Sequence, residues 1–89
     1  MLATCEISMY PLKDDYEPVI IDFILRLKKN PKLTIEVNGL STQVFGEFDV
    51  LTSAINAEMK ISLETNKIMF VMKLGKGELK KEKIADVLK

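Results

Sequence analysis

The sequence contains no histidine and only one cysteine, Cys5. The missing histidine excludes His-based catalytic triads and histidine metal ligands, and a lone cysteine excludes a disulfide within the chain. Cys5 has no histidine to activate it, so a buried, inert thiol is the simpler interpretation. We therefore predict a protein that is not an enzyme and that needs neither a metal nor a cofactor.

An excess of charge and a long apolar run are also missing. Thirteen basic and thirteen acidic residues cancel, whereas binding to a phosphate backbone needs a basic surface. No apolar run approaches the roughly 18 residues of a membrane helix, and Glu6 interrupts the N-terminal apolar stretch that a secretory leader would need. We expect a soluble, cytoplasmic protein with no nucleic-acid and no membrane partner.

The chain has 89 residues, which indicates one domain over residues 1–89. A domain of this size buries only about 60–65% of the surface that its unfolded chain exposes. Its stability would therefore gain from burial between subunits. We expect an oligomer.

Hydrophobic periodicity divides the chain into alternating strands and helices. Strands are predicted over residues 2–10, 33–38, 41–48 and 67–74, because apolar and polar side chains alternate there or an apolar run is continuous. Apolar residues at helical spacing predict helices that begin at the caps Asp14 or Asp15 and Asp49. This is an α+β, ferredoxin-like βαββαβ fold over a core of residues 2–75. Both helices should cover one face of an antiparallel sheet of order 4-1-3-2, followed by a short C-terminal helix over 78–88.

Three local features carry further expectations. Asn38-Gly39 is typical of a hairpin turn in which both residues take a positive φ. Gly46 falls on the core side of its strand, where it would let a helix approach closely. The nearly continuous apolar run over 67–74 favours a central or doubly covered strand.

Two helices cover only one side of such a sheet, and the other side carries a mixture of polar, aliphatic and aromatic residues. The predicted members are Glu6, Ser8, Tyr10, Thr34, Glu36, Gln43, Phe45, Glu47, Met69, Val71 and Lys73. Mixed surfaces of this kind are typical of ligand or partner contact. A solvated sheet face with scattered apolar residues is the alternative.

Three segments carry a resemblance to a known family. Residues 5–12 read Cys-Glu-Ile-Ser-Met-Tyr-Pro-Leu before Asp14-Asp15-Tyr16, residues 40–46 read Leu-Ser-Thr-Gln-Val-Phe-Gly, and residues 72–75 read Met-Lys-Leu-Gly. Together they resemble the YkoF-like domains of the thiamine/hydroxymethylpyrimidine-binding family. The resemblance implies a ferredoxin-like domain that pairs with another copy through its sheet. It also implies that thiamine or its pyrimidine moiety is the ligand.

The chemistry of an aminopyrimidine suits several of these side chains. A carboxylate such as Glu6 can hold a protonated ring nitrogen and the adjacent amino group through two hydrogen bonds. Hydroxyl groups can donate or accept, and an aromatic ring can stack on the ligand. The predicted ligand-binding residues are Glu6, Ser8, Tyr10, Ser41, Thr42 and Phe45. Thr42 alternates onto the helix side, so it would reach a ligand only near the strand end.

These observations favour a non-catalytic binding protein for thiamine or its hydroxymethylpyrimidine moiety, acting in thiamine uptake or salvage. It would assemble as a homodimer or homotetramer through the open sheet face. The alternative is an oligomeric interaction or regulatory module without a small-molecule ligand. An acylphosphatase-like enzyme on the same fold is excluded, because the loop over residues 11–15 is acidic and lacks the arginine that would cradle a phosphate.

Overall fold

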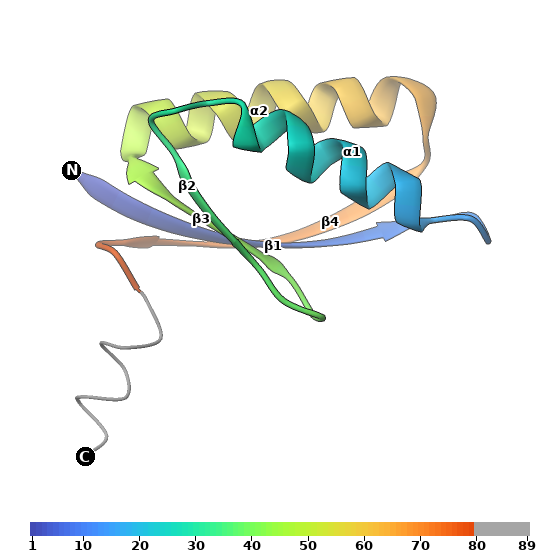
Figure 1. The fold of residues 1–89 in the computed structure, drawn as a ribbon, viewed down its shortest axis with the longest axis horizontal. Helices are drawn as coiled ribbons and strands as arrows, with labels where there is room; N and C mark the ends of the chain where they lie inside the picture. Colours follow the sequence, from blue (N-terminus) through green and yellow to red (C-terminus); the bar gives the residue numbers. More distant parts are fainter. Residues whose placement is uncertain (80–89) are drawn as a thin grey trace, which may run out of the picture.

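The structure is a computed structural model that describes residues 1–79. Along the chain lie β1 (Leu2–Pro11), α1 (Glu17–Lys28), β2 (Thr34–Val37), β3 (Thr42–Glu47), α2 (Phe48–Thr65) and β4 (Ile68–Lys76) (Figure 1). This βαββαβ order confirms the predicted α+β, ferredoxin-like fold. A C-terminal helix was predicted over 78–88, and all of that range after Leu79 lies outside the described residues.

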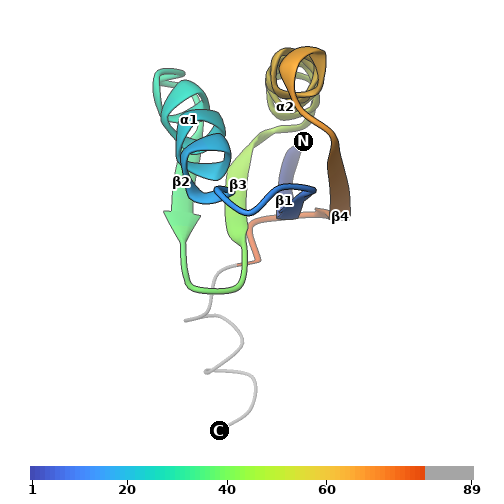
Figure 2. The same cartoon turned by 90° about the vertical axis from the view of Figure 1, so that its right-hand side faces the viewer.

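The strands form one antiparallel sheet of order β2-β3-β1-β4, which is the predicted order read from the opposite edge. Both helices lie on the same side of this sheet, with α1 towards β2 and α2 towards β1 and β4 (Figure 2). In the register, Glu6 of β1 lies between Gln43 of β3 and Lys73 of β4. The other side of the sheet carries no helix among residues 1–79. We call this side the open face.

The core lies between the helices and the sheet. Its fully buried members come from β1, β3 and both helices, namely Ala3, Cys5, Ile7, Phe23, Leu27, Val44, Leu51 and Ile55. The ring of Phe23 packs against Phe70 of β4 with centroids 5.6 Å apart. Burial, and secondarily the charge of Glu6, raises the pKa of the Cys5 thiol. The thiol is therefore a small hydrophobic group of the core, as the sequence indicated.

A half-buried polar contact joins the two helices. Arg26 of α1 donates from Nε to Glu58 Oε1 at 2.7 Å, and from Nη2 to the Glu58 carbonyl at 3.2 Å and to the Ser62 hydroxyl. These bonds explain why Ser62 occupies an otherwise apolar stripe of α2. A buried hydroxyl is tolerated there because it has a charged donor.

The predicted helix caps are wrong in both cases. The N-cap of α1 is Tyr16, with no side-chain bond, although Glu17 and the early proline lie in the first turn as expected. The N-cap of α2 is Glu47, whose carboxylate accepts from the backbone N–H groups of Asp49 at 2.9 Å and Val50 at 3.1 Å. Chiefly because of the Val50 bond, the pKa of Glu47 is lowered. A longer side chain one residue before the helix has taken the role assigned to Asp49.

The hairpin between β2 and β3 is confirmed, but its turn differs from the prediction. The Asn38 side chain accepts from the N–H groups of Leu40 at 2.8 Å and Ser41 at 3.0 Å. Within residues 1–79 only Gly77 has a positive φ, so Asn38-Gly39 does not form the expected turn. A side-chain acceptor organises this four-residue loop in place of a left-handed backbone.

Two expectations about packing are corrected by the neighbours of β3 and β4. A Cβ on Gly46 would meet Leu33 Cδ2 at 2.7 Å and the Lys32 carbonyl at 3.3 Å, so the segment before β2, and not a helix, makes the close approach. β4 is an edge strand and is not covered on both sides. The nearly continuous apolar run therefore does not mark a fully buried strand. Four of its side chains are 45–61% exposed, namely Met69, Val71, Met72 and Leu74.

Candidate functional site

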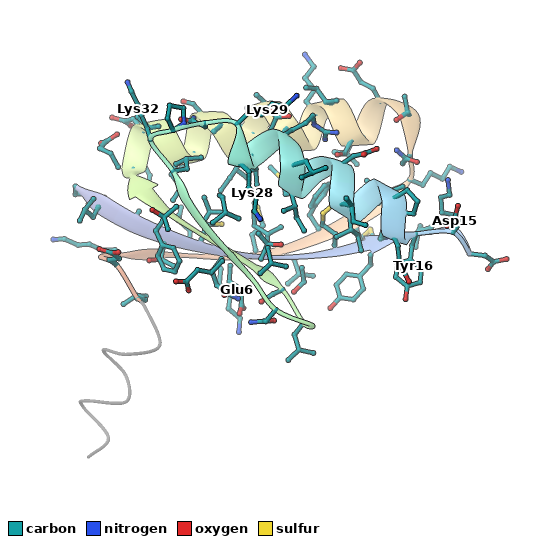
Figure 3. The ribbon with its side chains drawn as sticks, in the orientation of Figure 1. Glu6, Asp15, Tyr16, Lys28, Lys29 and Lys32 are labelled. Atoms are coloured by element: carbon teal, nitrogen blue, oxygen red, sulfur yellow. The ribbon has the colours of Figure 1, made fainter. Side chains whose placement is uncertain are left out.

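The open face displays the even-numbered residues of β1 and the odd-numbered residues of β3 and β4. Direct cross-strand partners in a sheet point to the same side, and Glu6 lies opposite both Gln43 and Lys73. Figure 3 shows Glu6 on the side of the sheet away from the helices. The predicted orientation of the strands is therefore confirmed.

Four polar side chains meet at the middle of this face. Gln43 Nε2 donates to Ser41 Oγ at 2.8 Å, Ser41 Oγ donates to Glu6 Oε2 at 3.1 Å, and Lys73 Nζ lies 3.9 Å from Glu6 Oε1. We call Glu6, Ser41, Gln43 and Lys73 the open-face cluster. It draws its members from β1, β4, β3 and the hairpin beside β3, so only the assembled sheet creates it.

The carboxylate of Glu6 is held on one oxygen and accessible on the other. Ser41 fixes Oε2, and the Gln43 amide in turn orients the Ser41 hydroxyl. The Lys73 side chain is 82% exposed and the Glu6 side chain 42%, so their ion pair is weak and easily exchanged for another cation. The cluster can therefore accept a cationic or strongly donating group at Glu6 Oε1 without breaking the Ser41 bond.

Beyond the cluster, towards the end of β1, the open face is apolar. Tyr10 pairs with Met69 and Ser8 pairs with Val71. Tyr10 is 55% exposed, Met69 61% and Val71 53%. An accessible aromatic ring beside a thioether and a branched aliphatic group forms a surface on which a flat heterocycle can stack.

The opposite end of the open face is closed by the chain itself. Thr4 Oγ1 donates to the Gly77 carbonyl at 2.7 Å and accepts from the Leu79 N–H at 2.9 Å. The Gly77 N–H also donates to the Leu2 carbonyl at 2.8 Å. The segment after β4 thus folds over β1, and Thr4 is buried there although it points away from the helices.

The structure divides the predicted ligand residues into two groups. Glu6, Ser8, Tyr10 and Ser41 lie on the open face, and a hydrogen bond joins Glu6 to Ser41. Phe45 also points to that face, opposite Thr4 in the register, but it is 3% exposed. Its ring is therefore not accessible for stacking on a ligand in this chain.

Thr42 lies on the helix side, as its alternation indicated. It lines a cavity of about 100 Å³ beneath α1 and the hairpin, where its neighbours include Ile7, Met9 and Ile24. Thr42 and Glu6 point to opposite sides of the sheet. Ser41, whose hydroxyl bonds Glu6, also lines this cavity at the hairpin, so only the strand end brings the two sides near each other.

Two members of the open-face cluster were not predicted as site residues. Gln43 and Lys73 were assigned to the open face by alternation, but nothing in the sequence placed them beside Glu6. Their proximity depends on the register of two strand pairs, which hairpin length and core packing determine. The opposite charges of Glu6 and Lys73, which alternation assigned to the same face, were the available signal.

The described part of the chain contains neither a metal-binding group nor a membrane-spanning helix. No group of three histidine, cysteine or acidic side chains suitable for a metal ion occurs among residues 1–79. No helix in the same range has the length and apolar character needed to cross a membrane.

Comparison with known proteins identifies the fold. No family profile matches the chain, and no curated protein matches it. A Thermotoga maritima protein (TM0486), described as a "putative thiamine biosynthesis/salvage protein", is similar with a TM-score of 0.81 and 18% identity over 98% of this chain and 99% of its own.

Two further solved structures show the same architecture. The hypothetical protein MJ1052 of Methanocaldococcus jannascii has a TM-score of 0.78 and 19% identity, covering 98% of this chain and 95% of its own. A domain of unknown function, DUF77, from Bacillus cereus has a TM-score of 0.67 and 19% identity, covering 93% and 86%. At these identities the likeness establishes that the chain shares the ferredoxin-like fold of these proteins.

Proposed function

We propose that this protein is a non-catalytic binding protein for thiamine or its hydroxymethylpyrimidine moiety, in thiamine uptake or salvage, and a member of the YkoF-like group. The observation that carries the proposal is the Glu6 carboxylate, fixed through Oε2 by Ser41 and accessible through Oε1. The fold similarity to a protein named for thiamine biosynthesis or salvage supports the same ligand class.

The ligand would lie along β1, from the open-face cluster to its apolar end. An aminopyrimidine protonated on its ring would replace Lys73 at Glu6 and donate to the carboxylate. Its ring, or the thiazolium cation of thiamine, would stack on the exposed ring of Tyr10, where a cation–π contact favours positive charge. Ser8, between the two residues on the same face, would supply a hydroxyl.

A second copy would close the site. The open face is a sheet surface and not a deep cleft, whereas small-molecule sites commonly bury most of the ligand. Two open faces packed together would enclose a flat ligand and cover the exposed side chains of Tyr10, Met69 and Val71. The proposed assembly is a homodimer, or a homotetramer, through this face.

Calorimetric titration with thiamine, thiamine phosphates and hydroxymethylpyrimidine tests this function. Glu6→Gln should weaken binding roughly 10-fold to 100-fold, because a charge-assisted hydrogen bond contributes about 1.5–3 kcal/mol. The matched control is Glu64→Gln, which makes the same change at an exposed residue of α2 and should leave the affinity unchanged. Equal affinities in the two variants would place the ligand elsewhere.

The exposed apolar end favours one alternative. Tyr10, Met69 and Val71 on a flat surface are also what a protein interface presents, so the open face would then serve only to assemble subunits in an interaction or regulatory module. Failure of all three compounds to bind the unmutated protein, together with dissociation of the oligomer by Tyr10→Ala, would favour that function.

A further inference from the structure

Among the four strands of the described chain, one basic side chain reaches the open face. β1, β2 and β3 contain no lysine or arginine, and of the two lysines of β4, Lys76 lies opposite Ala3 of the core. Lys73 lies opposite Glu6 and therefore points to the open face. Its Nζ is 3.9 Å from Glu6 Oε1, and its side chain is 82% exposed. A cation on a long, solvated stem thus lies beside the carboxylate of the open-face cluster.

The pair of Glu6 and Lys73 acts differently on a cation and on an anion. A cationic donor that binds Glu6 Oε1 takes the place of the Lys73 ammonium, because both need the same oxygen. Ser41 continues to hold Oε2 at 3.1 Å. The displaced ammonium stays close to the ligand, since its stem is fixed on the neighbouring strand. It repels a second positive charge there and attracts a negative one.

The other acidic residues that the strands place on this face are distant from Lys73. Glu36 is on β2, three strands from β4, which is about 14 Å at the usual strand spacing. Glu47 lies opposite Leu2, four residues along β1 from Glu6 and therefore about 13 Å away. Both separations exceed the Debye length of about 8 Å at physiological ionic strength. Glu6 is therefore the nearest acidic residue of the strands, and the cation of the ligand itself neutralises it.

The two ligands of the proposed function differ in charge at one point. In hydroxymethylpyrimidine, the hydroxymethyl group is attached to the ring carbon next to the one that carries the amino group. A phosphate monoester of that hydroxyl adds about −1.5 to −2 charge at pH 7. In thiamine, the same methylene group carries the positively charged thiazolium ring. When the amino group is held at Glu6, a substituent that is either anionic or cationic therefore lies beside the carboxylate.

We propose that the preferred ligand of the open face is the phosphate monoester of hydroxymethylpyrimidine, and that Lys73 selects it by pairing with the phosphate. This inference rests on the proposed function and narrows its ligand class. Glu6 would hold the cationic edge of the aminopyrimidine, and Lys73 would hold the phosphate. Each of the two opposite charges of the cluster would then meet its complement in one molecule. Thiamine would instead place its thiazolium near the ammonium of Lys73 and bind less tightly.

Calorimetric titration of the full chain with hydroxymethylpyrimidine, its phosphate ester and thiamine tests this selection. The unmutated protein should bind the ester about 10-fold more tightly than the free alcohol, as expected for one charge-assisted hydrogen bond. Lys73→Gln should weaken binding of the ester by about the same factor. It should also strengthen binding of the free alcohol and thiamine, because the lysine no longer competes for Glu6 or repels the thiazolium. Effects of opposite sign on different ligands cannot come from a general loss of structure.

Two variants and one competitor separate this pairing from effects of net charge. Lys76→Gln removes the same charge at an exposed position of the same strand, on the other side of the sheet, and should leave all three affinities unchanged. Lys73→Arg should retain the preference for the ester. Inorganic phosphate at the concentration of the ester should not compete with it, because inorganic phosphate lacks the group that Glu6 holds.

The outcomes distinguish this inference from the proposed function. If the ester binds no more tightly than the free alcohol, or if its advantage persists in Lys73→Gln, selection by Lys73 is wrong and the proposed function stands. Competition by inorganic phosphate would also overturn the inference, since the site would then bind any phosphate. Failure of all three compounds to bind the unmutated protein would contradict the proposed function and this inference with it.

Discussion

The two faces of the sheet are built from the same strands but differ in what they pack against. On the helix side, Cys5 and Val44 are 3% and 0% exposed and belong to the core. One residue further along each strand, Glu6 and Phe45 point the other way. Glu6 is half-exposed within a polar network. Alternation along the strand thus places the core on one face and leaves the polar network of Glu6 on the other.

The open face is not uniform, and its two ends differ as much as the two faces do. At the end near Thr4, the segment over residues 77–79 is hydrogen-bonded to β1, and Thr4 and Phe45 are buried. At the end near Tyr10, apolar side chains are exposed. The cluster and the Tyr10 end are therefore the more accessible parts of the open face.

The largest effect is expected where the helix-side packing is tightest. Gly46→Val should destabilise the fold by about 1–3 kcal/mol, because overpacking displaces neighbours and even a Cβ there would lie 2.7 Å from Leu33 Cδ2. Gln43→Val, on the open face of the same strand, should cost less because it removes only the bond to Ser41. Chemical denaturation of both variants measures the difference. Equal free energies of unfolding would contradict the assignment of the two faces.

A smaller effect is expected at the closed end of the open face. Thr4→Val preserves the shape of the side chain but removes the hydroxyl that bonds both Gly77 and Leu79. The expected loss is about 1–2 kcal/mol, since two backbone groups lose their partner. Hydrogen exchange should also show reduced protection of the Leu79 amide. Thr34→Val, at the exposed edge, is the control and should leave that amide unchanged.

The smallest effect is expected at Glu47, where β3 passes into α2. The folded state lowers the pKa of Glu47, mainly through the Val50 N–H bond, so its stabilisation is present above the pKa of the unfolded chain. That stabilisation is lost as the pH falls through the lower, folded pKa. Glu47→Gln should therefore be less stable than the unmutated protein near neutral pH, and the gap should narrow in acid. A gap independent of pH would show that the carboxylate charge is not involved.

The sequence by itself determined the element order, the faces of the strands and the burial of Cys5. These follow from local patterns, because the period of two in strands and of 3.6 in helices is imposed by backbone geometry. Once two crossovers and a hairpin were predicted, the handedness of the connections fixed the sheet order. Glu6 and Ser41 could be selected from the sequence because their chemistry, and the resemblance to a known family, pointed to them.

Only the tertiary structure decided which of these side chains meet. The open-face cluster needs the register of β1 with both β3 and β4. The burial of Phe45 on the open face, at 3% exposure, is likewise not contained in the local pattern. The run over 67–74 reads as a buried strand in sequence, yet the sheet order places β4 at an edge, where Met69, Val71, Met72 and Leu74 are 45–61% exposed. An apolar run indicates that the side chains of a strand are more stable when buried. It does not indicate whether residues of the same chain or of another chain bury them.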